Sequence, residues 1–217
     1  MDLYICPSRF LENKLLRASN LYTGKTFTIH NFIEKKPVPI TEHTDGPYIV
    51  FVGRLSKEKG VELLAQTARL LPQYRFVVAG TGPDDAVLNH IPNVVMAGFL
   101  TGQALTNLMA NAKLLVAPSV CYENCPLSIL EAHSMGVPVV TMNSGGMAEL
   151  VDDGKTGTLA TGADAKSVAQ AIERTMSDDS YYAQLKANCE TMGEKIMSVK
   201  EYSHILVEKY EQLIKQR

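Results

Sequence analysis

The sequence predicts an open, doubly wound α/β fold built on a parallel sheet. From residue 48 onward, short apolar runs rich in β-branched residues alternate with longer amphipathic segments, and Gly, Pro, Asn or Asp marks each boundary. The strand candidates are apolar along their whole length, which is typical of parallel strands that helices cover on both faces. In such a sheet, ligands bind beyond the carboxyl ends of the strands.

Strands and helices are expected in alternation along this region. The strand candidates, in chain order, are YIVFVG, RFVVAG, NVVMAGF, KLLVAPS, PVVTM and TGTLA. The amphipathic segments between and after them predict helices over residues 57–71, 101–112, 126–135, 148–151 and 165–176. Proline suits the first turn of the third of these helices, because a donor missing there breaks no helical hydrogen bond.

The two ends of the chain follow other patterns. At the start, LYIC is a strand candidate, Ser8 is expected to cap a helix through about Ala18, and KTFTIHN is a second strand candidate. This βαβ fragment is too small to stand alone. At the end, VKEYSHILVEKYEQLI places an apolar stripe on one helix face that needs a partner, formed by Val199, Tyr202, Leu206, Tyr210 and Leu213.

Four units are therefore expected. Residues 1–33 form the βαβ fragment, and residues 34–46, rich in Pro and charge, form a linker. Residues 47–198 form the main domain, and residues 199–217 form the terminal helix, which is expected to pack on another domain.

Composition limits the classes of function. A length of 217 residues suits one main domain, and a net charge of −2 gives no global reason to bind nucleic acid. The four cysteines lack the paired spacing of a zinc site, so reduced thiols in a cytoplasmic protein are expected. The first ten residues lack the pattern of a secretory signal. A peripheral position of a full-length parent at the inner membrane face stays open.

The most informative stretch is YENCPLSILEAHSMGVPVV, residues 122–140. If a helix begins near Pro126, its first amides form an anion site, with Glu123 before the helix and Glu131 roughly 8 Å along its axis. Because carboxylates repel phosphate, they are better suited to accept hydrogen bonds from hydroxyls on either side of it. A nucleotide sugar has this layout of ribose diol, diphosphate and sugar diol. Two unrelated surface glutamates are the alternative.

Cations are expected at the same edge of the sheet. In FVGRLSKEKG, Arg54 follows Gly53 at the end of a strand, and its guanidinium group can donate two hydrogen bonds to phosphate oxygens. Lys59 can neutralise a second negative charge. Lys57 is better explained as part of a solvated first turn.

Other motifs are less specific. The glycines of VAGTGPDD permit a tight turn without meeting the full dinucleotide fingerprint. For Glu149 in NSGGMAELV, capping of its own helix and contact with a ligand are equally open. His133 points away from Glu131 and is expected to pack in the core, as is Cys125. The chain has no D-x-D pair for a metal-held diphosphate, so metal-independent binding is expected.

Together these motifs resemble the carboxyl-terminal domain of retaining glycosyltransferases of family 4. The resemblance covers about residues 47–176, and the first 33 residues also resemble the end of that family's amino-terminal domain. The motifs that carry it are G-R-L-x-x-x-K-G at 53–60, G-x-G-P at 80–83, the E-x7-E pair Glu123 and Glu131, and G-G-x-x-E at 145–149.

The resemblance implies a GT-B fold, with two Rossmann-like domains, in which the matched domain binds the nucleotide-sugar donor. Arg54 and Lys59 would then bind the diphosphate, Glu131 the ribose hydroxyls, and Glu123 the transferred sugar. Catalytic roles fall to Glu123, Arg54 and Lys59. The backbone near Phe99 and Leu100 would hold the base, and the amides around Pro126, Leu127 and Ser128 would meet phosphate. The other donor-binding residues would be Gly53, Gly80, Gly82 and Asn124. Asn124 stands where the family often has Gly, and Asn tolerates the same turn conformations.

The predicted function is the donor-binding half of a metal-independent retaining glycosyltransferase. It would move a hexosyl-type sugar from a nucleotide diphosphate sugar to a glycan or lipid-linked acceptor, as in polysaccharide biosynthesis, with no further cofactor. The acceptor-binding amino-terminal domain is expected as a partner, so the 217 residues alone would be inactive and weakly self-associating. The alternatives are a non-catalytic module that binds nucleotide sugars and an unrelated α/β sheet that binds a protein partner.

Overall fold

The main body of the molecule is a six-stranded parallel sheet between layers of helices. The computed structural model describes residues 3–34 and 46–215. The strands lie in the order β5-β4-β3-β6-β7-β8, and every neighbouring pair is parallel. They are β3 (Ile49–Val52), β4 (Phe76–Ala79), β5 (Val94–Gly98), β6 (Leu114–Ala117), β7 (Val139–Met142) and β8 (Gly157–Ala160). The predicted α/β fold and all six predicted strands are confirmed.

The chain order reverses in the middle of this sheet. It runs outward from β3 through β4 to β5 and then returns to β6 on the other side of β3. The point between β3 and β6 is a topological switch point, where the loops leaving the two strands diverge and open a crevice. The strand order therefore predicts a ligand site at the carboxyl ends of β3 and β6.

Five helices of the main body follow the predicted pattern with one correction. They are α2 (Val61–Leu70), α3 (Gly102–Ala110), α4 (Leu127–Ser134), α5 (Met147–Leu150) and α6 (Ala165–Met176). The continuous helix predicted over residues 57–71 is wrong, because Gly60 has φ of +74° and separates a 3-10 turn, η2 (Lys57–Lys59), from α2. A second short turn, η3 (Asp85–Leu88), was not predicted.

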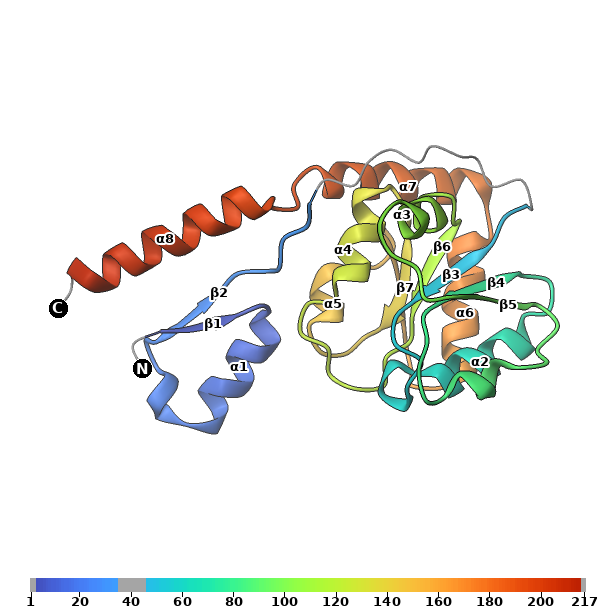
Figure 1. Cartoon of the computed structure of the whole chain (residues 1–217), viewed down its shortest axis with the longest axis horizontal. Helices are drawn as coiled ribbons and strands as arrows, with labels where there is room; N and C mark the ends of the chain where they lie inside the picture. The colour runs from blue at the N-terminus through green and yellow to red at the C-terminus, as the bar shows by residue number, and fades with distance from the viewer. Residues whose placement is uncertain (1–2, 35–45, 216–217) are drawn as a thin grey trace.

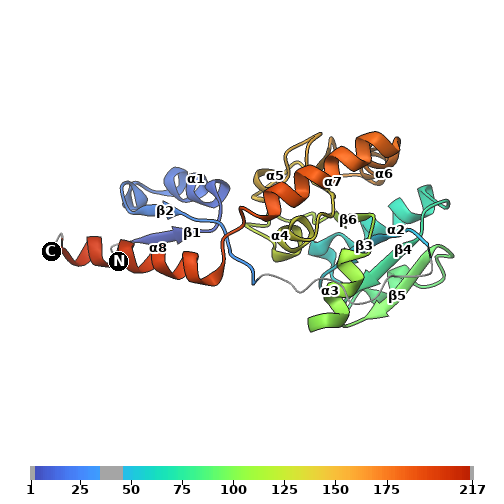
Figure 2. The same cartoon turned by 90° about the horizontal axis from the view of Figure 1, so that it is seen from above.

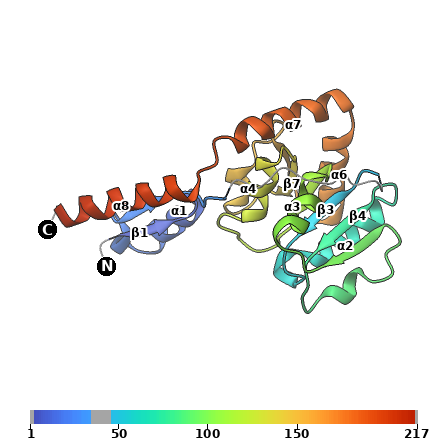
Figure 3. The ribbon, with the colours of Figure 1, turned by 45° about the horizontal axis from the view of Figure 1, so that its top comes forward.

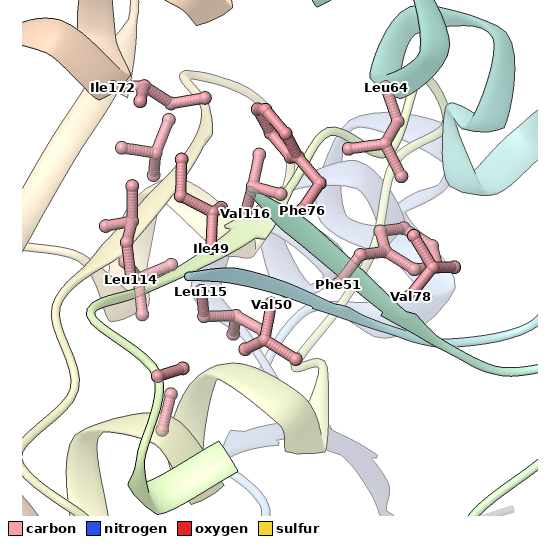
Figure 4. Close-up of a cluster of buried hydrophobic side chains, with 14 of the residues drawn as sticks. Ile49, Val50, Phe51, Leu64, Phe76, Val78, Leu114, Leu115, Val116 and Ile172 are labelled. Atoms are coloured by element: carbon pink, nitrogen blue, oxygen red, sulfur yellow. The ribbon is translucent and has the colours of Figure 1, made fainter. Parts of the chain in front are cut away.

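Alternation along the strands divides the core into two layers. Figure 4 shows Ile49, Val116 and Phe76 on the side of the sheet where Leu64 of α2 and Ile172 of α6 lie, whereas Val50 and Leu115 point to the other side. Helices α2 and α6 pack together on the first face, and α4 contacts β6, β7 and α7 (Asp179–Gly193). Burial on both faces explains why the inner strands β3, β4, β6 and β7 are apolar, whereas the edge strand β5 keeps Val95 and Met96 exposed.

A small second unit precedes the sheet domain, and we call residues 3–33 the front unit. It contains β1 (Tyr4–Cys6), α1 (Arg9–Ala18), a 3-10 turn η1 (Asn20–Tyr22) and β2 (Thr26–Thr28), with β1 and β2 parallel. The predicted cap is confirmed, since the Ser8 hydroxyl accepts a hydrogen bond from the amide of Leu11 at 3.2 Å. Figure 1 shows this unit beside the sheet domain, next to α5 and away from α2.

The last helix, α8 (Val199–Lys215), runs along the front unit rather than the sheet domain (Figures 2 and 3). The rings of Phe32 and Tyr202 lie 4.7 Å apart, and the Lys209 ammonium lies 4.8 Å from the centre of the Phe27 ring. The predicted stripe is only partly covered: Tyr202, Leu206 and Leu213 are half-buried, whereas Val199 and Tyr210 are exposed.

The predicted linker, residues 34–46, lies largely outside the described residues. Among the helices that the structure describes, none is long and apolar enough to cross a membrane.

Candidate functional site

The predicted site residues follow successive strands of the sheet. Arg54 comes two residues after β3, Gly80 directly after β4, and Phe99 directly after β5. Glu123 lies in the loop after β6 and Glu149 lies after β7. Because all six strands are parallel, their carboxyl ends form one edge of the sheet, and residues that are up to 95 positions apart in the chain lie at that edge.

A cavity of about 670 Å³ lies at the ends of β3, β4 and β5. Most of its lining is apolar or backbone, and the Arg54 side chain supplies a positive charge at its wall. Such a cavity, apolar with a few polar groups, suits a flat heterocyclic ring. Six residues named from the sequence line it together: Gly53, Arg54, Gly80, Gly82, Phe99 and Leu100.

The glycines of the G-x-G segment bring two loops close together. Gly80 has φ of +151°, and a Cβ atom there would lie 1.8 Å from the carbonyl oxygen of Gly53. Only glycine therefore fits, because the loop after β4 packs directly on the loop after β3. The glycine serves loop packing, which shapes one wall of the cavity.

Lys59 and Glu123 form an ion pair across the crevice between β3 and β6. The Lys59 ammonium donates to the Glu123 carboxylate, and the Ser119 hydroxyl donates to the same oxygen at 3.1 Å. Both partners are largely buried, with 33% and 16% of their side chains exposed. The sequence indicated both charged residues, but the contact between them and the part played by Ser119 were not predicted.

Helix α4 begins beside this ion pair. Pro126 is its N-cap residue, and the Ile129 amide donates to the Pro126 carbonyl at 3.2 Å. The amides of Leu127 and Ser128 precede that turn and point out of the helix start, where the helix dipole favours an anion. Glu131 is half-buried in the middle of α4. The predicted start of this helix is confirmed to within one residue.

Glu149 has a role that neither sequence interpretation included. Its carboxylate accepts hydrogen bonds from the amides of Arg9 at 2.9 Å and Phe10 at 2.5 Å, the first amides of α1. The Nε2 atom of His30 lies 3.5 Å from the same carboxylate. Glu149 therefore caps a helix that lies about 140 residues away in the chain. No local pattern signals such a contact.

Two more contacts join the front unit to the loop that carries Glu123. The Asn31 side chain donates to the Cys125 carbonyl at 2.8 Å, and the Asn31 amide lies 3.3 Å from the Cys125 sulfur. On the other side of Glu123, the Tyr122 ring lies 4.9 Å from the Phe10 ring, with the Lys14 ammonium 5.0 Å away. Asn124 between them is exposed.

The cysteine thiols and the buried imidazole near the site are uncharged at neutral pH. Burial raises the pKa of the Cys121 and Cys125 thiols, so neither is a thiolate nucleophile. Burial lowers the pKa of His133 to about 4, and its side chain is fully enclosed, which confirms the predicted packing role. Within the described ranges, no cluster of three His, Cys, Asp or Glu side chains could hold a metal ion.

Comparison with known proteins identifies relatives of the sheet domain. A family model described as "Glycosyl transferases group 1" matches residues 46–178. The chain is 31% identical over 145 residues to alpha-D-kanosaminyltransferase from Streptomyces kanamyceticus, covering 62% of this chain and 37% of that protein. It is 33% identical over 138 residues to a GDP-mannose-dependent alpha-mannosyltransferase from Corynebacterium glutamicum, covering 63% of this chain and 33% of that protein. The chain thus spans about a third of the length of these relatives.

The fold also matches solved structures. The crystal structure of HepE from Anabaena in complex with UDP and glucose superposes with a TM-score of 0.83 at 22% identity, covering 97% of this chain and 63% of that one. At this identity the likeness shows the fold, and it includes the front unit and α8 as well as the sheet domain.

Proposed function

Because this chain belongs to the group 1 family of glycosyl transferases, we propose that it is the donor-binding part of a retaining glycosyltransferase that uses a nucleotide diphosphate sugar. The supporting observation is the meeting, at one edge of the sheet, of an apolar cavity with the Lys59–Glu123 pair and the start of α4. The cavity suits a base, Lys59 and the start of α4 suit the diphosphate, and Glu123 suits a hydroxyl of the sugar. UDP in the related HepE structure supports this class of ligand.

In this proposal each part of the donor has its own contacts. The base occupies the cavity beside Phe99 and the backbone of Leu100, and Arg54 at the cavity wall binds the diphosphate. Glu131 accepts from the ribose hydroxyls, and Glu123 accepts from a hydroxyl of the transferred hexosyl sugar.

Charge stabilisation is the main catalytic contribution of these residues. When the bond between sugar and diphosphate breaks, negative charge grows on the leaving phosphate. Arg54, Lys59 and the Leu127 and Ser128 amides at the start of α4 are the positive groups that would stabilise it. This set needs no divalent metal, and the sequence has no D-x-D pair to hold one.

We propose that the acceptor binds to a preceding domain, which the front unit and α8 would complete. With only the donor wall present, an acceptor cannot be oriented against the sugar, so residues 1–217 alone would be inactive. The acceptor class, a glycan or a lipid-linked saccharide, follows from the same proposal.

Calorimetric titration of the chain tests this function. UDP-glucose, GDP-mannose and ADP-glucose are titrated with and without EDTA, and saturable binding of one of them in both conditions is expected. Binding that vanishes on chelation would overturn the metal-independent part. Absence of binding to all three would overturn the function itself. If binding is retained but the chain joined to a preceding domain transfers no sugar, the module binds nucleotide sugars without catalysis.

A further inference from the structure

The front unit touches the sheet domain at the loop that carries Glu123 and at the segment from Gly146 to Glu149. Glu149, after β7, accepts from the Arg9 and Phe10 amides at the start of α1. A carboxylate at a helix start gains from the helix dipole as well as from two charge-assisted hydrogen bonds. The contact is therefore stronger than an ordinary loop contact between two units.

The loop before Glu149 is held against the loop that carries Glu123. The Gly146 amide donates to the Glu123 carbonyl at 2.7 Å. A Cβ atom at Gly146 would lie 1.6 Å from the Asn124 carbonyl oxygen and 2.9 Å from the Ser8 Cβ. The front unit, the Gly146 loop and the Glu123 loop are thus stacked in contact, without room for a side chain at the centre.

Asn31 joins the front unit to the same loop by a separate route. Its side chain donates to the Cys125 carbonyl, and its amide contacts the Cys125 sulfur. The segment from Glu123 to Cys125 is therefore fixed from two sides by the front unit, through Glu149 on one side and through Asn31 on the other.

We propose that Glu149 is a positioning residue that couples docking of the front unit to the placement of Glu123. It touches no reacting group. It acts through Gly146, whose amide fixes the backbone of Glu123, and Asn31 completes the coupling. The coupling between the front unit and the Glu123 loop follows from these contacts alone. Its consequence for donor binding rests on the proposed function.

Residue-resolved hydrogen exchange on the whole chain, without ligand, tests the coupling. Coupling between two sites is reciprocal, so Asn31→Ala should speed exchange of the Gly146, Arg9 and Phe10 amides, none of which Asn31 touches. Glu149→Ala should speed exchange of the Asn31 amide. Each increase is expected to be about tenfold, which lies within the usual range of coupling between two sites. Glu62→Ala, an exposed carboxylate on α2, is the matched control.

The exchange rates of amides in β4 report whether each variant stays folded, and these rates should not change. If Glu149→Ala unfolds, Glu149→Gln, which keeps one acceptor oxygen, makes the same test with a smaller expected increase. The proposal is overturned if each variant speeds exchange only at its own direct partners, because the two contacts would then be independent.

Titration with UDP and with UDP-glucose tests the consequence for the donor. Glu149→Ala should weaken UDP-glucose about tenfold while UDP changes by less than about twofold. Equal losses for both ligands would show a general structural role and overturn the positioning role. If the wild-type chain binds neither ligand, the proposed function fails, and the exchange measurements still decide the coupling.

Discussion

At Glu123, one carboxylate is shared between a lysine, a serine and the sugar it is proposed to bind. Lys59 and Ser119 both donate to Oε1, which leaves the second oxygen of the carboxylate for a hydroxyl. Lys59 is thereby held at the crevice even before a phosphate arrives. In the proposed complex, Lys59 faces the diphosphate and Glu123 faces the sugar. Substitutions can therefore separate binding of the nucleotide from binding of the sugar.

Substitutions of the two glutamates should separate the parts of the donor. Glu131→Ala is expected to weaken UDP and UDP-glucose alike, by about tenfold or more, since a charged acceptor for a hydroxyl is worth about 1.5–3 kcal/mol. Glu123→Ala should weaken UDP-glucose by a similar factor and leave UDP nearly unaffected, because Lys59 loses the contact that holds it but also loses a carboxylate that competes with phosphate for its charge. Calorimetry measures both, with Glu62→Ala as the exposed control. Equal losses of UDP in the two variants would show that these roles are assigned wrongly.

His133 should make the fold sensitive to acid. Its pKa is about 4 in the folded protein and about 6.5 when unfolded, so the unfolded chain binds the proton first as the pH falls. The stability is complete above about pH 6.5 and falls as the pH drops toward 4, by about 3 kcal/mol. His133→Leu should remove this component.

Urea unfolding at pH 7.5 and pH 4.5 measures the difference between wild type and His133→Leu. His204→Gln, on the exposed face of α8, is the control for loss of an imidazole outside the core. A wild-type pH dependence that survives in His133→Leu would show that other groups control acid unfolding.

At the scale of elements, the strands were predictable and the loop contacts were not. A buried parallel strand carries its signal in its own residues, so β3 to β8 could be read from short apolar runs. The position of Glu123 after β6 and of Arg54 after β3 followed from the parallel order. The Glu149 contact with α1 could not be predicted, because it depends on how a loop 140 residues away packs. The break at Gly60 was missed because a single αL residue leaves the apolar spacing intact.

Between β8 and α6, two buried hydroxyls form a hydrogen bond whose direction can be tested by substitution. The Thr175 hydroxyl donates to the Ala171 carbonyl at 2.8 Å, so the proton in its 2.7 Å bond with Thr158 comes from Thr158. Thr175→Val leaves a buried donor without an acceptor and should cost about 1–3 kcal/mol. Thr158→Val removes the donor itself and should cost less.

Urea unfolding of both single variants and of the double variant measures this asymmetry. The double variant should be no less stable than Thr175→Val alone, because no orphaned donor remains. A larger loss for Thr158→Val would show that the proton lies the other way.

At the scale of the whole molecule, the front unit and α8 form an end that the sheet domain does not cover. A two-stranded parallel sheet has unpaired backbone on both outer edges, and such small sheets need further strands or helices to be stable. Helix α8 covers part of this unit through Tyr202 and Lys209, while Val207, Tyr210 and Ile214 stay exposed. An open strand edge and an exposed apolar helix face both favour association with a further α/β domain or with a second copy.

Supplying that domain should change both activity and assembly. Residues 1–217 alone are expected to transfer no sugar and to self-associate weakly, whereas addition of a preceding acceptor domain in trans should give transfer and suppress self-association. Product formation and sedimentation measure the two effects on the same samples. Tyr210→Ser, which removes exposed apolar surface outside the donor site, should reduce self-association without changing the affinity for UDP. Strong sugar transfer by residues 1–217 alone would refute the half-enzyme proposal, because the acceptor would then have to be oriented by the donor wall itself.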